Sequence, residues 1–330
     1  MFSYLFQRLI YMLIVIFVTS IVTFMIIQLP AGDFVDNLAV QLARSGQEVN
    51  EAQLENLRIQ FGLDEPMYGQ YLRWVRNVLT GDLGWSFQYQ QRVQDLIGDR
   101  IGLTMTISLM TLIFTYLVAI PIGIYSATNQ YSIGDYAAMF VGFLGLATPN
   151  FLLALILIVI FLNAGWSVGG LFSPEYMRAD WSVAKLIDLL KHLPLPIIII
   201  GTAGTAGLIR VMRASLLDEL GKQYVVTARA KGVGESRLLF KYPVRVALNP
   251  IVSTIGWLLP FIVSGGFIVE LVLNLPTTGP MLYSALITED MFLASSLLLI
   301  LTVLTVIGTF ISDVLLVWVD PRIRFNEKEA

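Results

Sequence analysis

Long runs of apolar residues dominate this chain, and shorter polar stretches separate them. A hydrocarbon core of about 30 Å needs roughly 20 apolar residues in helical form. Six runs reach or approach this length, at 9–29, 103–127, 136–162, 193–213, 246–269 and 291–319. The pattern therefore predicts an all-α membrane protein with six transmembrane helices, folded as one transmembrane domain.

The polar stretches between these runs predict the tails and loops. The longest, 30–102, exceeds a simple link and contains amphipathic patterns such as QYLRWVRNVL, so we expect an external segment of short helices there. Within it, GDLGWSF predicts a turn followed by an apolar anchor. The remaining polar stretches predict two short tails, a large basic loop and a small external loop, at 1–8, 320–330, 214–245 and 270–290.

The composition agrees with a membrane protein and excludes several classes of site. Hydrophobic residues make up 56% of the chain and charged residues only 14%, against about 25% charged in soluble domains. The chain has no cysteine, so it can form neither a disulfide nor a thiolate metal site. Its only histidine, His192, excludes a multi-histidine metal centre, and the net charge of −3 does not suggest nucleic-acid binding. We therefore expect no metal or cofactor on this chain.

The distribution of basic residues predicts the orientation. Residues 210–245 carry eight Lys or Arg and three Asp or Glu, and such an excess marks cytoplasmic loops. Six spans place both termini on the side of this basic loop, where twelve Lys or Arg gather, against three in 163–192 and none in 270–290. Both termini are expected in the cytoplasm. The 128–135 loop departs from the rule, because it holds no Lys or Arg.

The chain lacks the motifs of an energy-converting or catalytic centre. It contains no GxxxxGK[ST], HExxH or GxSxG pattern, so we expect no nucleotide hydrolysis or other enzymatic activity on it. Ion-coupled carriers usually hold ionisable groups inside their spans, and these spans are almost free of them. The energy source is therefore expected on another protein. An ion-coupled carrier, which would work without an ATPase, and a membrane enzyme remain as alternatives.

Six segments in order carry a family resemblance. They are QLPAGD, YLRWVRNVLTGDLGWS, TPNFLLALIL, YVVTARAKG, ELVLNLPTTGPMLYSALITED and DVLLVWVDPRIRF, which begin at residues 28, 71, 148, 224, 270 and 313. Nearly end to end, the chain resembles the inner-membrane permease subunits of ATP-binding-cassette importers, in the dipeptide/oligopeptide branch. This resemblance implies the six-helix type I importer (MetI-like) permease fold.

The resemblance also implies partners, a location and a cargo. Two homologous permeases would share a central pathway, two cytoplasmic subunits would bind ATP and Mg, and an external or periplasmic solute-binding protein would deliver the cargo. The complex would lie in the cytoplasmic (inner) membrane of a bacterium or archaeon. Import of di- or oligopeptides is the implied activity, with oligosaccharides or another small solute as the alternative.

The family's coupling helix, which docks on an ATPase subunit, matches eight residues of the basic loop. They are Tyr224, Val225, Thr227, Ala228, Arg229, Ala230, Lys231 and Gly232. We expect the alanines to allow close approach, Arg229 and Lys231 to supply charge, and Gly232 to close the helix in the left-handed conformation. Val-Thr-Ala stands here where the broader superfamily has Glu-Ala-Ala, so a pairing acid is missing. The alternative interpretation is a basic linker that only sets the topology.

Helix-breaking residues inside the predicted spans suggest where a pathway could run. Irregular backbone persists at membrane depth where it is buried in protein or lines a water-filled cavity. Pro149-Asn150 and Ser264-Gly265-Gly266 interrupt two of the spans. We therefore consider Asn150, Ser264, Gly265 and Gly266 as pathway or gate residues, against the alternative that they only allow close helix packing.

Overall fold

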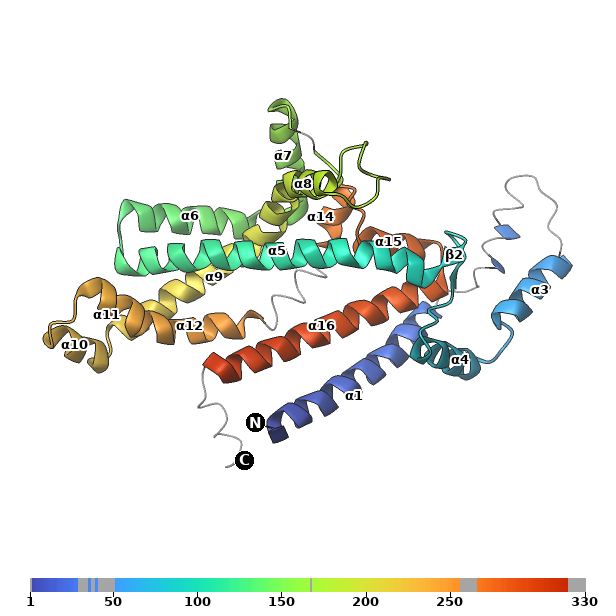
Figure 1. The fold of residues 1–330 in the computed structure, drawn as a ribbon, viewed down its shortest axis with the longest axis horizontal. Helices are drawn as coiled ribbons and strands as arrows, with labels where there is room; N and C mark the ends of the chain where they lie inside the picture. Colours follow the sequence, from blue (N-terminus) through green and yellow to red (C-terminus); the bar gives the residue numbers. More distant parts are fainter. Residues whose placement is uncertain are drawn as a thin grey trace. The chain divides into compact units, whose positions relative to one another are not determined.

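The structure is a computed structural model, and it describes residues 2–28, 35–36, 39–40, 51–166, 168–255 and 266–319. The chain divides into two compact units, which are described separately. The first unit comprises 1–8, 105–275 and 305–330, and the second comprises 9–104 and 276–304. Apart from one short hairpin, the regular elements of the described part are helices (Figure 1).

Four long helices are apolar enough to cross a membrane. They are α1 (Phe2–Ile27), α5 (Val93–Thr128), α9 (Pro194–Leu220) and α16 (Met291–Val319). These helices lie over the first, second, fourth and sixth of the predicted spans. At 1.5 Å per residue, the 27 residues of α9 extend for about 40 Å, which exceeds the thickness of the hydrocarbon core.

The predicted span at 136–162 is not one continuous helix. It lies in α6 (Ile133–Ala147) and α7 (Asn150–Asn163), whose axes are bent by 108°. Thr148, between them, has an extended backbone with φ −88° and ψ 119°, which is the conformation that a following proline favours. Pro149 also lacks the N–H that would continue the α6 ladder. The pair is therefore a broken span or a re-entrant hairpin.

The remaining helices of the first unit are short. They are α8 (Val183–His192), α10 (Gln223–Ala230), α11 (Glu235–Lys241), α12 (Pro243–Ser253) and α14 (Phe267–Val272). The span predicted at 246–269 falls partly on residues 256–265, which lie outside the described part of the chain.

Helix α9 forms the centre of the first unit. It packs against α6, α7, α12 and α14, and its buried side chains include Ile199, Leu208, Met212 and Leu216. On α5, a Cβ atom at Gly123 would lie 2.6 Å from the Met212 Cβ. Only glycine permits this close approach of the two helices.

The second unit contains α3 (Glu51–Phe61), α4 (Met67–Leu79), β1 (Trp85–Ser86), β2 (Gln91–Arg92) and α15 (Thr278–Ile287). Helices α3 and α4 fall within 30–102, the stretch in which the sequence predicts short helices. The two strands pair antiparallel, with Trp85 opposite Arg92. An apolar core joins the start of α5 to α15 and α16, through Val93, Ile97, Met281, Ala285, Leu293 and Leu297.

The turn predicted in GDLGWSF is present, and it is stabilised by the backbone conformation of two glycines and by hydrogen bonds to Asp290. Gly81 and Gly84 have φ values of +84° and +86°, a region that glycine enters without a steric cost. The fully buried Asp290 accepts hydrogen bonds from the Ser86 Oγ (2.5 Å), the Gln88 N–H (3.1 Å) and the Leu293 N–H (3.2 Å). Burial raises the pKa of Asp290, and these hydrogen bonds partly offset that effect. The hairpin is thereby tied to the start of α16.

Candidate functional site

The short helix predicted in the basic loop is α10, and its limits follow from local sequence. Helix α9 ends at Leu220, and Gly221 and Lys222 separate it from α10. The Lys222 backbone is extended, with φ −73° and ψ 148°, which is typical of a residue that starts a new helix. The chain therefore leaves a long membrane helix and turns into a separate helix of 8 residues.

The carboxyl end of α10 is a Schellman motif. Gly232 has φ +76°, its N–H donates to the Arg229 carbonyl (3.0 Å), and the Val233 N–H donates to the Ala228 carbonyl (3.3 Å). This is the hydrogen-bond pattern of a helix closed by a left-handed glycine. The conformation expected for Gly232 is thus confirmed.

Helix α10 has an inner and an outer face. Val225 and Ala228 are buried against Leu238 of α11, and Val233 and Tyr242 pack around them. The small side chain of Ala228 therefore allows α11 to approach α10 closely. Because Ala228 is buried within the chain, it is not available to contact a docking partner. The other matched residues are exposed: Tyr224, Thr227, Arg229, Ala230, Lys231 and Gly232.

Arg229 is paired within the chain. Its Nε lies 2.7 Å from the Glu235 Oε1 and its Nη2 lies 3.1 Å from the Glu235 Oε2, so the ion pair is bidentate. The hydrogen bond and charge of Arg229 lower the pKa of Glu235. Glu235, six positions further on, thus supplies an acid partner for Arg229. Sequence reasoning missed this pair, although the spacing across Gly232 could have indicated it.

The outer face of this region carries an excess of positive charge. The exposed basic residues beyond the Arg229–Glu235 pair are Lys222, Lys231, Arg237, Lys241 and Arg245. The Tyr224 hydroxyl donates to the Glu219 Oε2 at 2.5 Å. Partial burial and the nearby Glu219 charge raise the pKa of Tyr224, so this phenol remains a neutral donor. The exposed surface of the α10 region is therefore suited to bind a groove on another protein that is lined by acidic or polar side chains.

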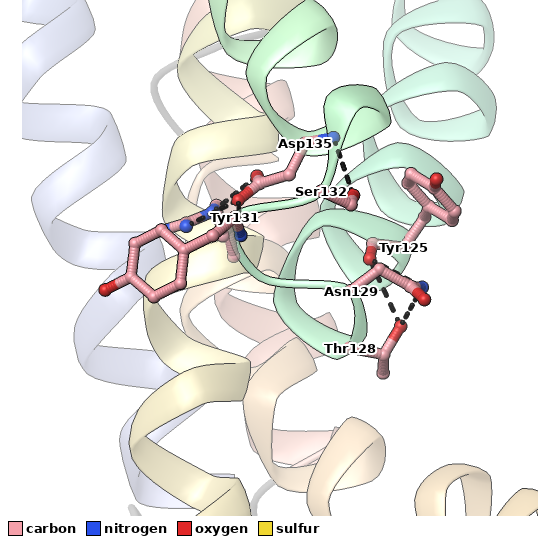
Figure 2. A network of polar contacts seen from close by, with 7 residues as sticks. Tyr125, Thr128, Asn129, Tyr131, Ser132 and Asp135 are labelled. Carbon is pink, nitrogen blue, oxygen red and sulfur yellow. Dashed lines mark hydrogen bonds and ion pairs between the residues drawn. The ribbon is translucent and has the colours of Figure 1, made fainter.

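A second ion pair, whose carboxylate is buried, braces the loop between α5 and α6 (Figure 2). The Asp135 carboxylate is fully buried and accepts from the Arg213 Nε and Nη2, each at 2.9 Å. The Tyr131 N–H donates to the same carboxylate (2.9 Å), and the Ser132 Oγ caps α6. A cation from α9 thus lies beside the loop that holds no Lys or Arg of its own.

The candidate pathway residues are only partly described. Asn150 is the half-buried first residue of α7, directly after the break at Pro149. Gly266 precedes α14 with φ −72° and ψ −15°, a conformation open to any residue. Ser264 and Gly265 lie outside the described part of the chain. The described residues therefore bring no gate together.

Comparison with known families decides the class of this protein. Residues 119–325, more than half of the chain, match the family described as "Binding-protein-dependent transport system inner membrane component". Residues 1–110 match the N-terminal region of the same kind of membrane component. The chain belongs to this permease family. The family resemblance drawn from the six segments is thereby confirmed.

Named relatives cover almost the whole permease. An oligopeptide transport system permease protein of Bacillus subtilis, AppB, is 36% identical over 84% of this chain and 87% of its own length. A putative peptide permease protein of Brucella ovis is 33% identical over 98% of this chain and 99% of its own. A peptidoglycan transport system permease protein of Agrobacterium fabrum, YejB, is 30% identical over 87% of this chain and 80% of its own.

Membership of the family establishes the coarse function. The permease is a multi-pass inner-membrane component of a binding-protein-dependent ATP-binding-cassette importer. It transports solute with the help of a binding protein and of ATP hydrolysis on other subunits. The basic loop that contains α10 lies inside the matched region 119–325.

Proposed function

We propose that this permease forms half of a pathway for di- or oligopeptides. The names of the Bacillus and Brucella relatives support this cargo. A peptidoglycan system among the relatives indicates that related permeases serve other solutes, and an oligosaccharide or another small solute is the alternative. The binding protein, which is a separate chain, would select the solute.

The proposed complex pairs this chain with a second homologous permease, two cytoplasmic ATPase subunits and an external binding protein. In this arrangement the permease has six spans, with α6 and α7 together forming the third. Both termini and the α10 region lie in the cytoplasm. In the same proposal, Asn150, which follows the break at Pro149, and the residues Ser264, Gly265 and Gly266 would line the pathway or its gate.

The exposed face of α10 is the proposed docking surface for an ATPase subunit. The observation that carries this proposal is a short, solvent-exposed helix held rigidly by its own chain. Its Schellman end and the packing of Val225 on Leu238 fix its shape, while Arg229 and Lys231 remain at its rim. A preformed surface loses little conformational entropy when it binds a partner.

A continuous path of packed helices could carry force from this surface. Helix α10 packs on α11, α11 on α12, and α12 on α9. ATP binding would draw the ATPase subunits together, move both coupling helices and rock the spans between inward-open and outward-open states. A ligand can shift these populations only through a difference in affinity, so ATP and the binding protein must both favour the outward-open state.

Site-directed crosslinking tests the docking surface, because the native chain has no cysteine. Thr227→Cys in α10 should crosslink to a cysteine in the ATPase subunit, whereas Glu175→Cys, an exposed residue of the 163–192 connection, should not. Transport-competent complexes without a Thr227→Cys crosslink to any part of the ATPase surface would overturn the proposal. Uptake of labelled peptides and oligosaccharides by the assembled importer tests the cargo separately.

A further inference from the structure

Helix α8 presents apolar side chains outward and polar side chains inward. Its buried residues include Lys185, Asp188 and His192. Its exposed residues are Val183, Ala184, Leu186, Ile187, Leu190 and Lys191, of which only the last is charged. A helix that faces water on its open side shows the reverse pattern.

The inward polar face is satisfied by the preceding loop of the same chain. Asp188 accepts from the Ser173 N–H and the Ser173 Oγ, both at 2.7 Å. The Lys185 Nζ donates to the Ala179 carbonyl at 2.5 Å and lies 5.0 Å from the centre of the Phe172 ring. These contacts fix the rotation of α8, so its apolar face points outward as a consequence of specific polar packing.

The position of α8 along the chain places it at a membrane boundary. It ends immediately before α9, which begins at Pro194. From Pro194 to Arg213 the helix rises by about 29 Å at 1.5 Å per residue, close to the thickness of the hydrocarbon core. Thus α8 lies at the end of α9 opposite the Asp135–Arg213 pair. Its 10 residues, about 15 Å long, are too few to cross the bilayer.

Two tryptophans agree with this boundary position. Trp166 and Trp181, which precede α8 in the same connection, are 59% and 65% exposed. Tryptophan is enriched at the membrane–water interface, where its ring is partly apolar and its N–H reaches water. Lys191, at the last turn, has a long apolar stem that can lie along lipid while its ammonium group reaches the head groups.

We propose that α8 lies in the interfacial layer of the bilayer, with Leu186, Ile187 and Leu190 inserted between lipid chains. The occupant of this face is lipid and not a soluble partner. A binding protein that docks and leaves in each cycle would expose the face to water, and the face offers few hydrogen-bonding groups for such a transient contact. Interfacial helices bury their apolar side about 5–10 Å deep, which suits side chains of this length.

Fluorescence quenching in the assembled importer tests this proposal. Leu186→Cys and Leu190→Cys are labelled with an environment-sensitive fluorophore in nanodiscs, with accessible cysteines of the other subunits replaced. Phospholipids brominated near the head group should quench these probes several-fold more strongly than a probe at Glu175→Cys, because the inserted side chains lie at the depth of the bromine atoms. Aqueous iodide should quench the Glu175→Cys probe more strongly. Glu175 is exposed in the same connection and is therefore a matched control.

Two outcomes would overturn the proposal. If iodide quenches the probes at 186 and 190 as strongly as the probe at 175, the apolar face lies in water. If neither iodide nor brominated lipid quenches them, a protein covers the face, and the second permease becomes the occupant. Neither outcome affects the docking surface proposed for α10, because the labelled residues lie before α9 and α10 follows it.

Discussion

Gly232 is the residue on which the shape of α10 depends most directly. Its φ of +76° suits glycine, since other L-residues pay a steric cost of roughly 1–2 kcal/mol there. Its N–H also closes the helix on Arg229. A nearby glycine, Gly234, has φ −57° and no such requirement, and a Cβ there would meet open space. Substitutions at Gly232 and Gly234 can therefore be compared directly, with Gly234 as the control.

Gly232→Pro should uncouple transport from ATP hydrolysis. Proline fixes φ near −65° and removes the N–H, so it reverses the turn and frees the end of α10. We expect uptake to fall at least about tenfold, equivalent to about 1.4 kcal/mol of lost coupling free energy, while membrane insertion is unchanged. Gly234→Ala should retain normal uptake. Normal transport by the Gly232→Pro variant in a reconstituted importer would exclude a role for the shape of α10.

The Arg229–Glu235 pair allows the charge of the surface to be separated from its folding. Arg229→Glu would place two acids side by side and should reduce uptake about tenfold. The double exchange Arg229→Glu with Glu235→Arg restores an ion pair within the chain. If Arg229 contacts the ATPase subunit directly, the double exchange should restore little of the lost uptake. Full rescue of uptake by the exchange would mean that the pair acts only on α10 itself.

At the scale of elements, local signals in the sequence predict much of the structure. The long helices lie where apolar runs predict them, and Gly232 ends α10 as its position suggests. The side of α10 that faces inward could not be predicted, because Val225 and Ala228 alone give too short a period to define a face. Asp135 and Arg213 pair across 78 positions, a contact that no local pattern encodes.

The hairpin of the second unit gives a test of packing at this scale. Gly81 and Gly84 have nearly equal positive φ values. A Cβ at Gly84 would lie 2.9 Å from the Phe292 ring, whereas nothing lies within 4 Å of one at Gly81. Gly81→Ala should therefore cost roughly 1–2 kcal/mol from backbone strain. Gly84→Ala should cost roughly 1–3 kcal/mol more through overpacking. Thermal unfolding in nanodiscs would measure both, and equal shifts would contradict the packing of Gly84 on Phe292.

At the scale of the whole molecule, the break at Pro149 controls the topology. If α6 and α7 cross the membrane together, the permease has six spans and the connections before α5 and after α7 share a side. If the pair re-enters, the connection after α7 lies on the opposite side. Glu270 and Asp290, which border the small predicted external loop, are 3% and 0% exposed, so thiols there would report packing instead of sidedness. A labelling test of sidedness therefore needs cysteines at exposed positions.

Gln91 in β2 and Glu175 after α7 are both exposed, and together they distinguish the two topologies. In intact cells, a thiol reagent that cannot cross the membrane should label both Gln91→Cys and Glu175→Cys, because the basic loop orients the spans. Thr227→Cys should react only after permeabilisation, since α9 separates it from Glu175. Labelling of Gln91→Cys but not Glu175→Cys would show that α6 and α7 re-enter. In that case α9 would carry α10 to the outer side, where no ATPase could bind it.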